Sequence, residues 1–285
     1  MKILVTGGSG YLGTHIRSHF KADDLSLRHG KDILNVEHAR AAGAYDVVIH
    51  LAASLDRSGV GSENTLNVNV DGTRKILKAM RKGGTFIFMS TKDIYARVAD
   101  QYSEVPETCP IDYLGQTAYE WSKYIAESYV ELYANMNDFR SCIFRLSTPY
   151  APASEGNSPN FVGAIAESIN LGEPIALPAA GRPVRDIIHV DDISAACDAF
   201  LDSAVRHGKY NLGGGRKNAV SMKELVEKME EVSGLQAIID NETKLPDPSP
   251  LNYVSDLSLI DHELAWSPKI SVEEGLATLF RSTAK

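Results

Sequence analysis

The sequence predicts an α/β protein built around a doubly wound parallel β-sheet, and two observations support this fold class. Short runs rich in Val, Ile, Leu and Phe alternate with longer stretches of helical periodicity in the first half of the 285-residue chain. The first apolar run leads directly into a glycine-rich turn that spans Gly7 to Gly13. Strands that alternate with helices are joined in parallel, and such a sheet binds ligands at the carboxyl ends of its strands.

The elements of the first half are expected to alternate along the chain. Apolar runs predict strands at residues 2–6, 25–27, 47–51, 85–90 and 139–145. Helical patterns begin near Tyr11, Val36, Thr65 and Thr117. Each of the first four strands is thus followed by a helix, as a doubly wound sheet requires.

The second half is expected to form a smaller α/β domain. The segment STPYAPASEGNSPN is rich in Pro, Ser and Asn, which predicts a loop. Helices are expected at 161–170 and 192–204 and a strand at 210–212, and Ser221 with Glu224 forms the capping-box pattern of a further helix. We expect residues 1–150 to form the first domain and residues 151–285 mainly the second. The strand and helix near residues 186–213 are expected to return to the first.

Composition and charge exclude several function classes. A formal charge of -8 argues against nucleic acid as a partner, and the apolar runs are too short to span a bilayer. Three widely spaced cysteines, Cys109, Cys142 and Cys197, predict neither disulfides nor a zinc site, and the histidines show no metal-binding spacing. The N-terminal sequence MKILVTGGSG lacks the layout of a signal peptide. We therefore expect a cytoplasmic protein with no membrane, nucleic-acid or metal site.

Gly7, Gly10 and Gly13 form a Gly-x-x-Gly-x-x-Gly pattern between the first strand and the first helix. Glycines permit the tight turn and the close approach of backbone to a pyrophosphate, and the helix N-terminus supplies N–H groups and a positive dipole. The same pattern without a ligand would be only a compact βα turn. Its position at the start of a βα repeat favours a nicotinamide dinucleotide cofactor.

Arg28 bears on which dinucleotide binds. Sites for NAD usually carry a carboxylate at the end of the second strand, but the segment from Leu25 has none before Asp32. Arg28 occupies the position of a 2′-phosphate, whose geometry a guanidinium matches. Arg28 could instead be a solvated loop charge. We favour NADP(H), with NAD as the alternative, and expect Asp32 and Ile33 to face the adenine.

Tyr119 and Lys123 lie four residues apart in the helix expected from Thr117, and therefore on one face of it. With twelve tyrosines in the chain, the motif alone could arise by chance. A phenol has a pKa of about 10, so acting as a base near neutrality requires a decrease of roughly three units, or about 4 kcal/mol. One cation at about 4 Å supplies roughly that much at an effective dielectric constant near 20. Lys123 is one such cation, an oxidised nicotinamide would be a second, and the hydroxyl of Thr91 could hold the substrate oxygen.

These residues together resemble a known family. The stretches VTGGSGYLG, VIHLAAS, NVNVDGT, STKDIYA, YEWSK and RDIIHVDD occur in the order and spacing of the extended short-chain dehydrogenase/reductases. Within them, the chain is similar to the NAD-dependent epimerase/dehydratase group, which modifies nucleotide sugars. The resemblance covers nearly the whole chain. It implies a Rossmann domain with a small C-terminal substrate domain, and a homodimer formed through the helices from Thr65 and Thr117.

The resemblance also implies a set of site residues. The catalytic residues would be Thr91, Tyr119 and Lys123. With the glycine motif, the dinucleotide site would comprise Gly7, Gly10, Tyr11, Leu12, Gly13, Arg28, Asp32, Ile33, Leu51, Ala52, Ala53, Ser90, Tyr119 and Lys123. A nucleotide-sugar substrate would contact Thr91, Asp93, Thr148, Asn160 and Arg185. From the residues alone, Arg185 could instead pair with Asp186 or Asp191, Asn160 could be a helix cap, and Lys92–Asp93 could be a solvated ion pair.

Three functions remain open from the sequence. Asp93 occupies the position of an acid in sugar dehydratases, yet the short Thr91–Asp93 arrangement and Arg28 are closer to reductases of nucleotide-linked 4-keto sugars that use NADPH. The alternatives are an NAD-dependent 4-epimerase or 4,6-dehydratase and a non-catalytic dinucleotide sensor. The intact triad argues against the sensor, and we expect the reductase.

Overall fold

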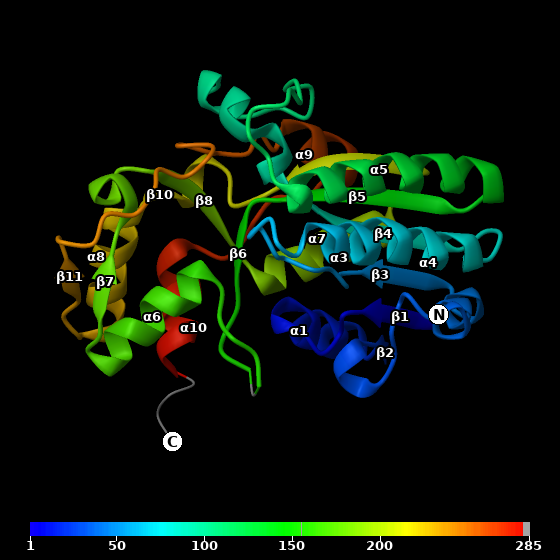
Figure 1. Cartoon of the computed structure of the whole chain (residues 1–285), viewed down its shortest axis with the longest axis horizontal. Helices are drawn as coiled ribbons and strands as arrows, with labels where there is room; N and C mark the ends of the chain where they lie inside the picture. Colours follow the sequence, from blue (N-terminus) through cyan, green and yellow to red (C-terminus); the bar gives the residue numbers. More distant parts are fainter. Residues whose placement is uncertain (155, 282–285) are drawn as a thin grey trace.

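The computed structural model describes residues 1–154 and 156–281. Its centre is a six-stranded parallel sheet with the order β2-β1-β3-β4-β5-β9 (Figure 1). The strands are β1 (Ile3–Thr6), β2 (Asp23–Leu25), β3 (Val47–His50), β4 (Thr85–Thr91), β5 (Arg140–Leu146) and β9 (His207–Leu212). Because β1 pairs with both β2 and β3, the connections diverge at β1, and this divergence creates a crevice at the carboxyl ends of the strands. The predicted α/β fold class is confirmed.

Helices cover both faces of this sheet, and each face has its own core. On one face, Val5 of β1 packs with residues of α1 (Tyr11–Phe20) and α7 (Val190–Asp202). On the other face, Leu4 packs with residues of α2 (Val36–Arg40), α4 (Thr73–Ala79) and α5 (Ala118–Asn137). Successive residues of a strand point to opposite faces, so the apolar run of β1 serves both cores.

The second strand begins and ends two residues earlier than expected. Residues 25–27 were expected to form it, but the strand is Asp23–Leu25 and residues 27–29 form the short helical turn η1 (Leu27–His29). Leu25 is buried and pairs with Thr6, whereas the side chain of Leu27 is 75% exposed. The apolar run therefore extends beyond the core-facing part of the strand.

The helical region expected from Thr65 begins slightly earlier. It consists of α3 (Ser62–Leu66), the wide turn η3 (Asn67–Gly72) and α4. The short turn η2 (Ala41–Ala44) lies between α2 and β3. The helical segment η4 (Lys92–Gln101) follows β4 and is kinked at Ala96.

A second group of elements packs at the end of the main sheet where its strands have their carboxyl ends (Figure 1). Strand β8 (Val184–His189) pairs with β6 (Thr148–Tyr150) and β10 (Ala219–Ser221), while β7 (Pro174–Ala176) pairs with β11 (Ile238–Asp240). Their helices are α6 (Phe161–Leu171), α8 (Met222–Ser233) and α10 (Val272–Arg281), which enclose a separate apolar core. The remaining elements are α9 (Ser258–Leu264) and the turns η5 (Pro178–Gly181) and η6 (Arg216–Asn218).

Two elements that follow β8 in the chain, α7 and β9, return to the main sheet. Helix α7 packs on the face of α1, and β9 pairs along its whole length with β5. The predicted capping box of Ser221 is confirmed, because Glu224 N donates to Ser221 Oγ at 3.1 Å and Ser221 N donates to Glu224 Oε2 at 2.7 Å. Among the described residues, no helix is both long enough and apolar enough to cross a bilayer.

Candidate active site

The glycine motif forms the turn between β1 and α1. Gly7 has a φ of +71°, and a Cβ there would lie 2.8 Å from Ala52 N. A Cβ on Gly13 would lie 2.0 Å from the carbonyl oxygen of Gly7. Gly10 begins α1 without a side-chain cap. The first-turn N–H groups of α1 are thus available to an anion, and the glycines permit its close approach.

A cleft of about 960 Å³ lies over the carboxyl ends of β1 to β5. Every residue predicted for the site lines this cleft, with the exception of Arg185. They include the glycine motif, the stretch Leu51-Ala52-Ala53 after β3, Thr91 at the end of β4, and Tyr119 with Lys123 on α5. The fold therefore brings together residues that are separated by more than half of the chain.

Arg28 lies at the rim of this cleft. Its Nη1 donates to the carbonyl oxygen of Ser9 at 2.8 Å and to Asn157 Oδ1 at 3.0 Å. It is therefore not simply a solvated charge, because it links the glycine turn to the loop after β6. Asp32 and Ile33 line the same end of the cleft, and Asp32 Oδ1 accepts a hydrogen bond from Leu34 N at 2.8 Å.

The expectation that the second strand lacks a carboxylate is wrong, because the strand starts earlier than expected. Asp24 lies in β2 and accepts hydrogen bonds from the hydroxyl of Ser26 and, at 2.5 Å, from the ring of His29. Ser26 Oγ in turn accepts from Ser9 N at 3.0 Å. Ser26 lines the cleft, and Asp24 is not among the described residues that do. Asp24 thus acts on the glycine turn through Ser26.

Ser90 lies in the wall of the cleft with its hydroxyl turned toward the protein interior. Ser90 Oγ donates to Glu127 Oε1 at 2.5 Å, and Glu127 forms a buried ion pair with Arg145 at 2.7 Å. Arg145 also donates to Tyr95 Oη at 2.8 Å. The side chain of Ser90 therefore belongs to a buried polar network behind the site.

A capping box sets Tyr119 at the start of α5. Thr117 N donates to Glu120 Oε2 at 2.7 Å, and Thr117 Oγ1 accepts from Tyr119 N at 3.2 Å. Lys123 lies one turn further along the same face, where its Nζ donates to the carbonyl oxygen of Met89 at 2.8 Å. Burial lowers the pKa of Lys123 to about 8.

The pKa of Tyr119 differs from the expectation. Burial and then the Asp93 carboxylate raise it to about 12, while Arg57 and a hydrogen bond from Thr91 act in the opposite direction. The sequence suggested Lys123 as the cation that lowers this pKa. In the structure the cation with the largest effect is Arg57, because the ammonium group of Lys123 is held at the end of β4.

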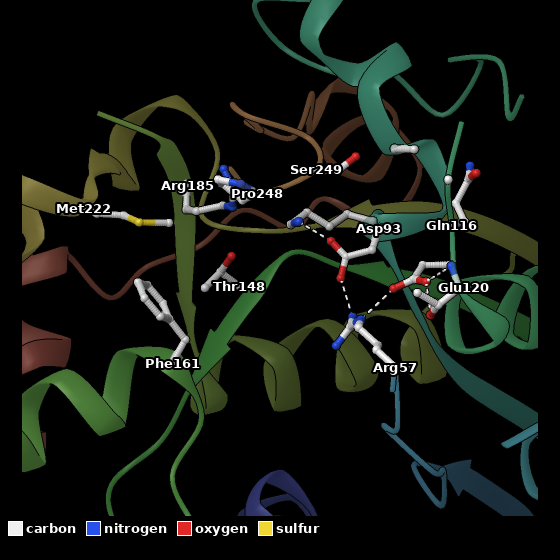
Figure 2. A pocket seen from close by; sticks show the side chains of 14 residues that line it. Arg57, Asp93, Gln116, Glu120, Thr148, Phe161, Arg185, Met222, Pro248 and Ser249 are labelled. Carbon is white, nitrogen blue, oxygen red and sulfur yellow. Dashed lines mark hydrogen bonds and ion pairs between the residues drawn. The ribbon is translucent and has the colours of Figure 1, made fainter. Parts of the chain in front are cut away.

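Arg57 is the functional candidate that sequence reasoning missed. Its guanidinium carbon lies 4.2 Å from the ring centroid of Tyr119. Arg57 Nε donates to Glu120 Oε1 at 2.6 Å, and Nη2 donates to Asp93 Oδ2 at 2.8 Å, as Figure 2 shows. Arg57 is the single basic residue in the segment 51–62, at the carboxyl end of the third strand. That position in a parallel sheet was the signal that could have identified it.

Asp93 is held between two cations. It pairs with Arg57 at 2.8 Å and with the ammonium group of Lys92. Lys92 is buried, so the alternative of a solvated Lys92–Asp93 pair is wrong. Burial alone would raise the pKa of Asp93, but Lys92 and Arg57 outweigh it and the pKa is lowered. Asp93 is therefore a carboxylate at neutral pH.

A second cavity of about 400 Å³ adjoins the cleft and shares Arg57, Lys92, Asp93, Thr148 and Phe161 with it. Figure 2 shows Arg185 and Pro248 on the side of this cavity opposite Glu120.

Arg185 lines the second cavity without an acidic partner. Its guanidinium donates to the carbonyl oxygens of Val184, Leu251 and Pro250 at 2.7 to 2.8 Å. Among the described residues Arg185 forms no ion pair, so the expected alternatives with Asp186 or Asp191 are wrong. Asp186 instead accepts from Ser147 Oγ and from two main-chain N–H groups. Burial lowers the pKa of Arg185 from its usual value.

Asn160 is the N-cap of α6, as the alternative interpretation proposed. Its Oδ1 accepts from Gly163 N at 3.3 Å, and its amide donates to the carbonyl oxygen of Pro149. Asn160 and Thr148 nevertheless line the main cleft, next to Pro149.

Comparison with known proteins agrees with this geometry. The sequence profile of the NAD dependent epimerase/dehydratase family matches residues 3–213. The chain belongs to this family. Among its relatives is CDP-paratose 2-epimerase from Salmonella typhi, which is 27% identical over 100% of this chain and 99% of its own length. The protein is accordingly an enzyme of a family whose members modify nucleotide sugars.

Solved structures show the same fold. MoeE5 in complex with UDP-glucuronic acid and NAD superimposes with a TM-score of 0.85 at 21% identity, covering 99% of both chains. RMD from Pseudomonas aeruginosa complexed with NADPH superimposes with a TM-score of 0.83 at 21% identity, covering 99% of this chain and 98% of that one.

The cleft of this epimerase/dehydratase-family enzyme fits a nicotinamide dinucleotide. The uncapped start of α1 suits a pyrophosphate, and the glycine turn leaves room that a Cβ would fill. The volume of about 960 Å³ is at the upper end of ordinary ligand pockets, as a molecule with two nucleoside halves requires. The dinucleotide would extend from Arg28 and Asp32 to Tyr119 and Lys123.

Proposed function

We propose that this enzyme reduces a nucleotide-linked 4-keto sugar with NADPH. The observation behind this proposal is the position of Tyr119, which lies in the dinucleotide cleft beside Asp93 and Arg57, where the cleft meets the second cavity. A sugar in the second cavity would thus present its carbonyl group between Tyr119 and the dinucleotide. A bound NADPH would provide the hydride for the carbonyl carbon, and the carbonyl oxygen would take a proton.

Tyr119 supplies that proton in the proposed reaction. A phenol whose pKa is raised to about 12 is protonated at neutral pH, which is the state that a proton donor needs. The hydroxyl of Thr91 acts to lower the pKa of this phenol from the same cleft and would hold the substrate oxygen in line with it. Lys123 would orient the ribose of the dinucleotide from its fixed place at the end of β4.

The charges around Asp93 favour a reductase over a dehydratase. Elimination of water from a sugar needs a protonated acid beside the leaving hydroxyl. Asp93 is paired with Lys92 and Arg57, and its pKa is lowered. A carboxylate held in this way cannot donate a proton at neutral pH.

The preference for NADPH rests on Arg28. Its guanidinium lies at the rim of the cleft, within hydrogen-bond distance of the glycine turn, where a 2′-phosphate could join it. Asp24, which would repel that phosphate, is covered by Ser26 and paired with His29. A relative of the same fold, RMD, is complexed with NADPH.

The second cavity suits the diphosphate and sugar of the substrate. The charged residues that line it are Arg57, Lys92 and Arg185, against Asp93 and Glu120, so positive charge prevails. Thr148 lines both this cavity and the cleft, and Asn160 lines the cleft next to Phe161, which also lines both. MoeE5, which shares the fold, binds UDP-glucuronic acid.

A second candidate is an epimerase that keeps NAD bound through its cycle. The relationship to CDP-paratose 2-epimerase over the full chain favours it. An epimerase begins by oxidising an alcohol, so it would require the phenol of Tyr119 to accept a proton first.

The dinucleotide that accompanies the purified enzyme distinguishes the candidates. We expect an exchangeable site that binds NADPH more tightly than NADH, and consumption of NADPH with a nucleotide-linked 4-keto sugar. Tyr119→Phe should bind NADPH normally and lose about 10²- to 10⁴-fold in kcat/KM. Tightly bound NAD with interconversion of 4-epimers would establish the epimerase instead. Normal binding of dinucleotide with no turnover of any nucleotide sugar would establish a sensor.

A further inference from the structure

Arg57 connects three parts of the site that come from different segments of the chain. It belongs to the loop after β3, whereas its partners Asp93 and Glu120 belong to η4 and α5. It lines both the dinucleotide cleft and the second cavity. Nothing in the glycine motif or in the Tyr-x-x-x-Lys pair accounts for a cation at this place.

We propose that Arg57 is a positioning residue for Tyr119, a positive charge fixed on the face of the phenol ring that sets how readily the phenol gives up its proton. Its guanidinium lies 4.2 Å from the ring centroid, well within the range of a cation–π contact. Two hydrogen bonds to carboxylates, at 2.6 and 2.8 Å, hold the planar group in this place.

Lys123 does not fill this role in the structure. Its ammonium group donates to the carbonyl oxygen of Met89 and lies 4.9 Å from the ring centroid of Phe88. It is held toward β4, at the cofactor side of the cleft. Arg57 contacts the ring of Tyr119 itself. Arg57 would therefore act on the proton of Tyr119, and Lys123 would act on the dinucleotide.

The charges that face Tyr119 explain why a second cation is needed. Asp93 from η4 and Glu120 from α5 both disfavour loss of the proton, and Lys92 is paired with Asp93. Arg57 opposes both carboxylates at once, and Lys123 follows one turn further along α5. Without Arg57, Tyr119 would face two carboxylates, of which only Asp93 would keep a cationic partner, Lys92. The proton of Tyr119 would then be held more tightly.

This inference rests on the proposed function only in that Tyr119 transfers the proton, and it can be tested without a substrate. Difluorotyrosine, whose phenol is more acidic than that of tyrosine, would be introduced at position 119 of the full chain. Fluorine NMR would then report the titration of this one ring. The midpoint would be compared in the otherwise unchanged protein, in Arg57→Gln, in Arg57→Lys and in Arg81→Gln.

We expect Arg57→Gln to raise the midpoint by about one pH unit, because a half-exposed cation is partly screened by solvent. Arg57→Lys should raise it by less, since it keeps the charge and loses the planar stacking. Arg81→Gln is the matched control. Arg81 is as exposed as Arg57 and pairs with Asp46 at 2.6 Å away from both cavities, so the midpoint should stay unchanged.

An unchanged midpoint in folded Arg57→Gln would overturn the inference and reduce Arg57 to a structural tie between loops. Should Arg57→Gln not fold, Arg57→Met also removes the charge while keeping the aliphatic stem, and an unchanged midpoint in that variant would overturn the inference equally. If the midpoint rises but the enzyme turns over no nucleotide sugar, the role of Arg57 is supported and the proposed function is refuted. If the enzyme reduces a 4-keto sugar but the midpoint is unchanged, the proposed function is supported and the role of Arg57 is refuted.

Discussion

His50 shows how a single polar residue is accommodated beneath the site. It ends β3 in the interior, where Nδ1 lies 2.7 Å from Thr6 Oγ1 and Nε2 lies 2.9 Å from Thr73 Oγ1. Both ring nitrogens thus have a hydroxyl partner. Burial, and then the nearby charge of Lys123, lower the pKa of His50 to about 3. The ring is therefore neutral at any pH at which the enzyme would work.

Acid should destabilise the fold through His50. Its pKa in the folded state lies below the value of 6.5 for an unperturbed histidine, so the unfolded state takes up the proton first. The contribution of His50 is complete above about pH 6.5 and is lost as the pH falls toward 3. At about pH 5 the loss reaches about 2 kcal/mol. Urea unfolding at about pH 7.5 and at about pH 5 measures this effect. Between these two pH values, the free energy of unfolding should fall by about 2 kcal/mol more in wild type than in His50→Gln. Equal decreases in the two proteins would contradict the prediction.

Arg28 should decide between the two dinucleotides. Arg28→Ala should weaken NADPH by about tenfold or more and NADH far less, because a charge-assisted contact to the 2′-phosphate is lost only with NADPH. Isothermal titration of both dinucleotides measures this. Asn157→Ala is the control, since it removes the loop partner of Arg28 and leaves the guanidinium in place. Equal weakening of both dinucleotides in Arg28→Ala would mean that Arg28 acts only by holding the loop.

At the scale of elements, the start of α5 connects stability with the site. Glu120 accepts from Thr117 in the capping box and, through its other carboxylate oxygen, from Arg57. The residues that begin the helix therefore also hold the cation on Tyr119. The capping box of α8 makes the same kinds of hydrogen bond, but its glutamate, Glu224, does not hold Arg57.

Removing the two caps should have equal effects on stability and unequal effects on activity. Thr117→Ala and Ser221→Ala should each lower the free energy of unfolding by about 1 kcal/mol, because each leaves a first-turn N–H group without its side-chain acceptor. Only Thr117→Ala should also lower kcat, since Tyr119 N is the group that loses its partner. Unfolding curves and initial rates measure the two effects. A similar loss of kcat in Ser221→Ala would contradict the link between the α5 cap and Tyr119.

At the scale of the whole molecule, α5 carries an apolar surface that the described residues leave uncovered. Ile125, Leu132 and Met136 are exposed, with Leu132 at 51% and Met136 at 67%, and Tyr129 lies between them. Their spacing of three and four residues places them on one stripe of the helix. The homodimer expected from the sequence would use this stripe as part of its interface.

Charge on that stripe should separate the subunits. The double change Leu132→Glu and Met136→Glu would bury two carboxylates in the interface, so it should convert a dimer to a monomer at micromolar concentration. Sedimentation velocity measures this. Leu171→Glu on α6 is the control, because Leu171 is 64% exposed and lies in the other group of elements. A wild-type protein that sediments only as a monomer at micromolar concentration would contradict the expected homodimer.

The sequence by itself determined the features that depend on neighbouring residues. The alternation of apolar runs and helical patterns fixed the fold class, and the glycine motif fixed the turn between β1 and α1. The capping box at Ser221 and the shared face of Tyr119 and Lys123 were likewise visible, since each involves residues three or four positions apart. In all of these, helix or strand geometry converts spacing directly into position.

Only the tertiary structure decided which charges meet. Arg57 and Glu120 are 63 residues apart, and Arg185 and Pro250 are 65 apart, so no periodicity relates them. The burial of Lys92 and the place of Asp24 behind Ser26 also depend on how loops pack over the sheet. Local spacing fixes the direction of a side chain, but its pKa and its partners depend on whatever distant segments exclude water around it. For this reason the sequence predicted a role for Tyr119, and the fold showed that Arg57 is the cation beside it.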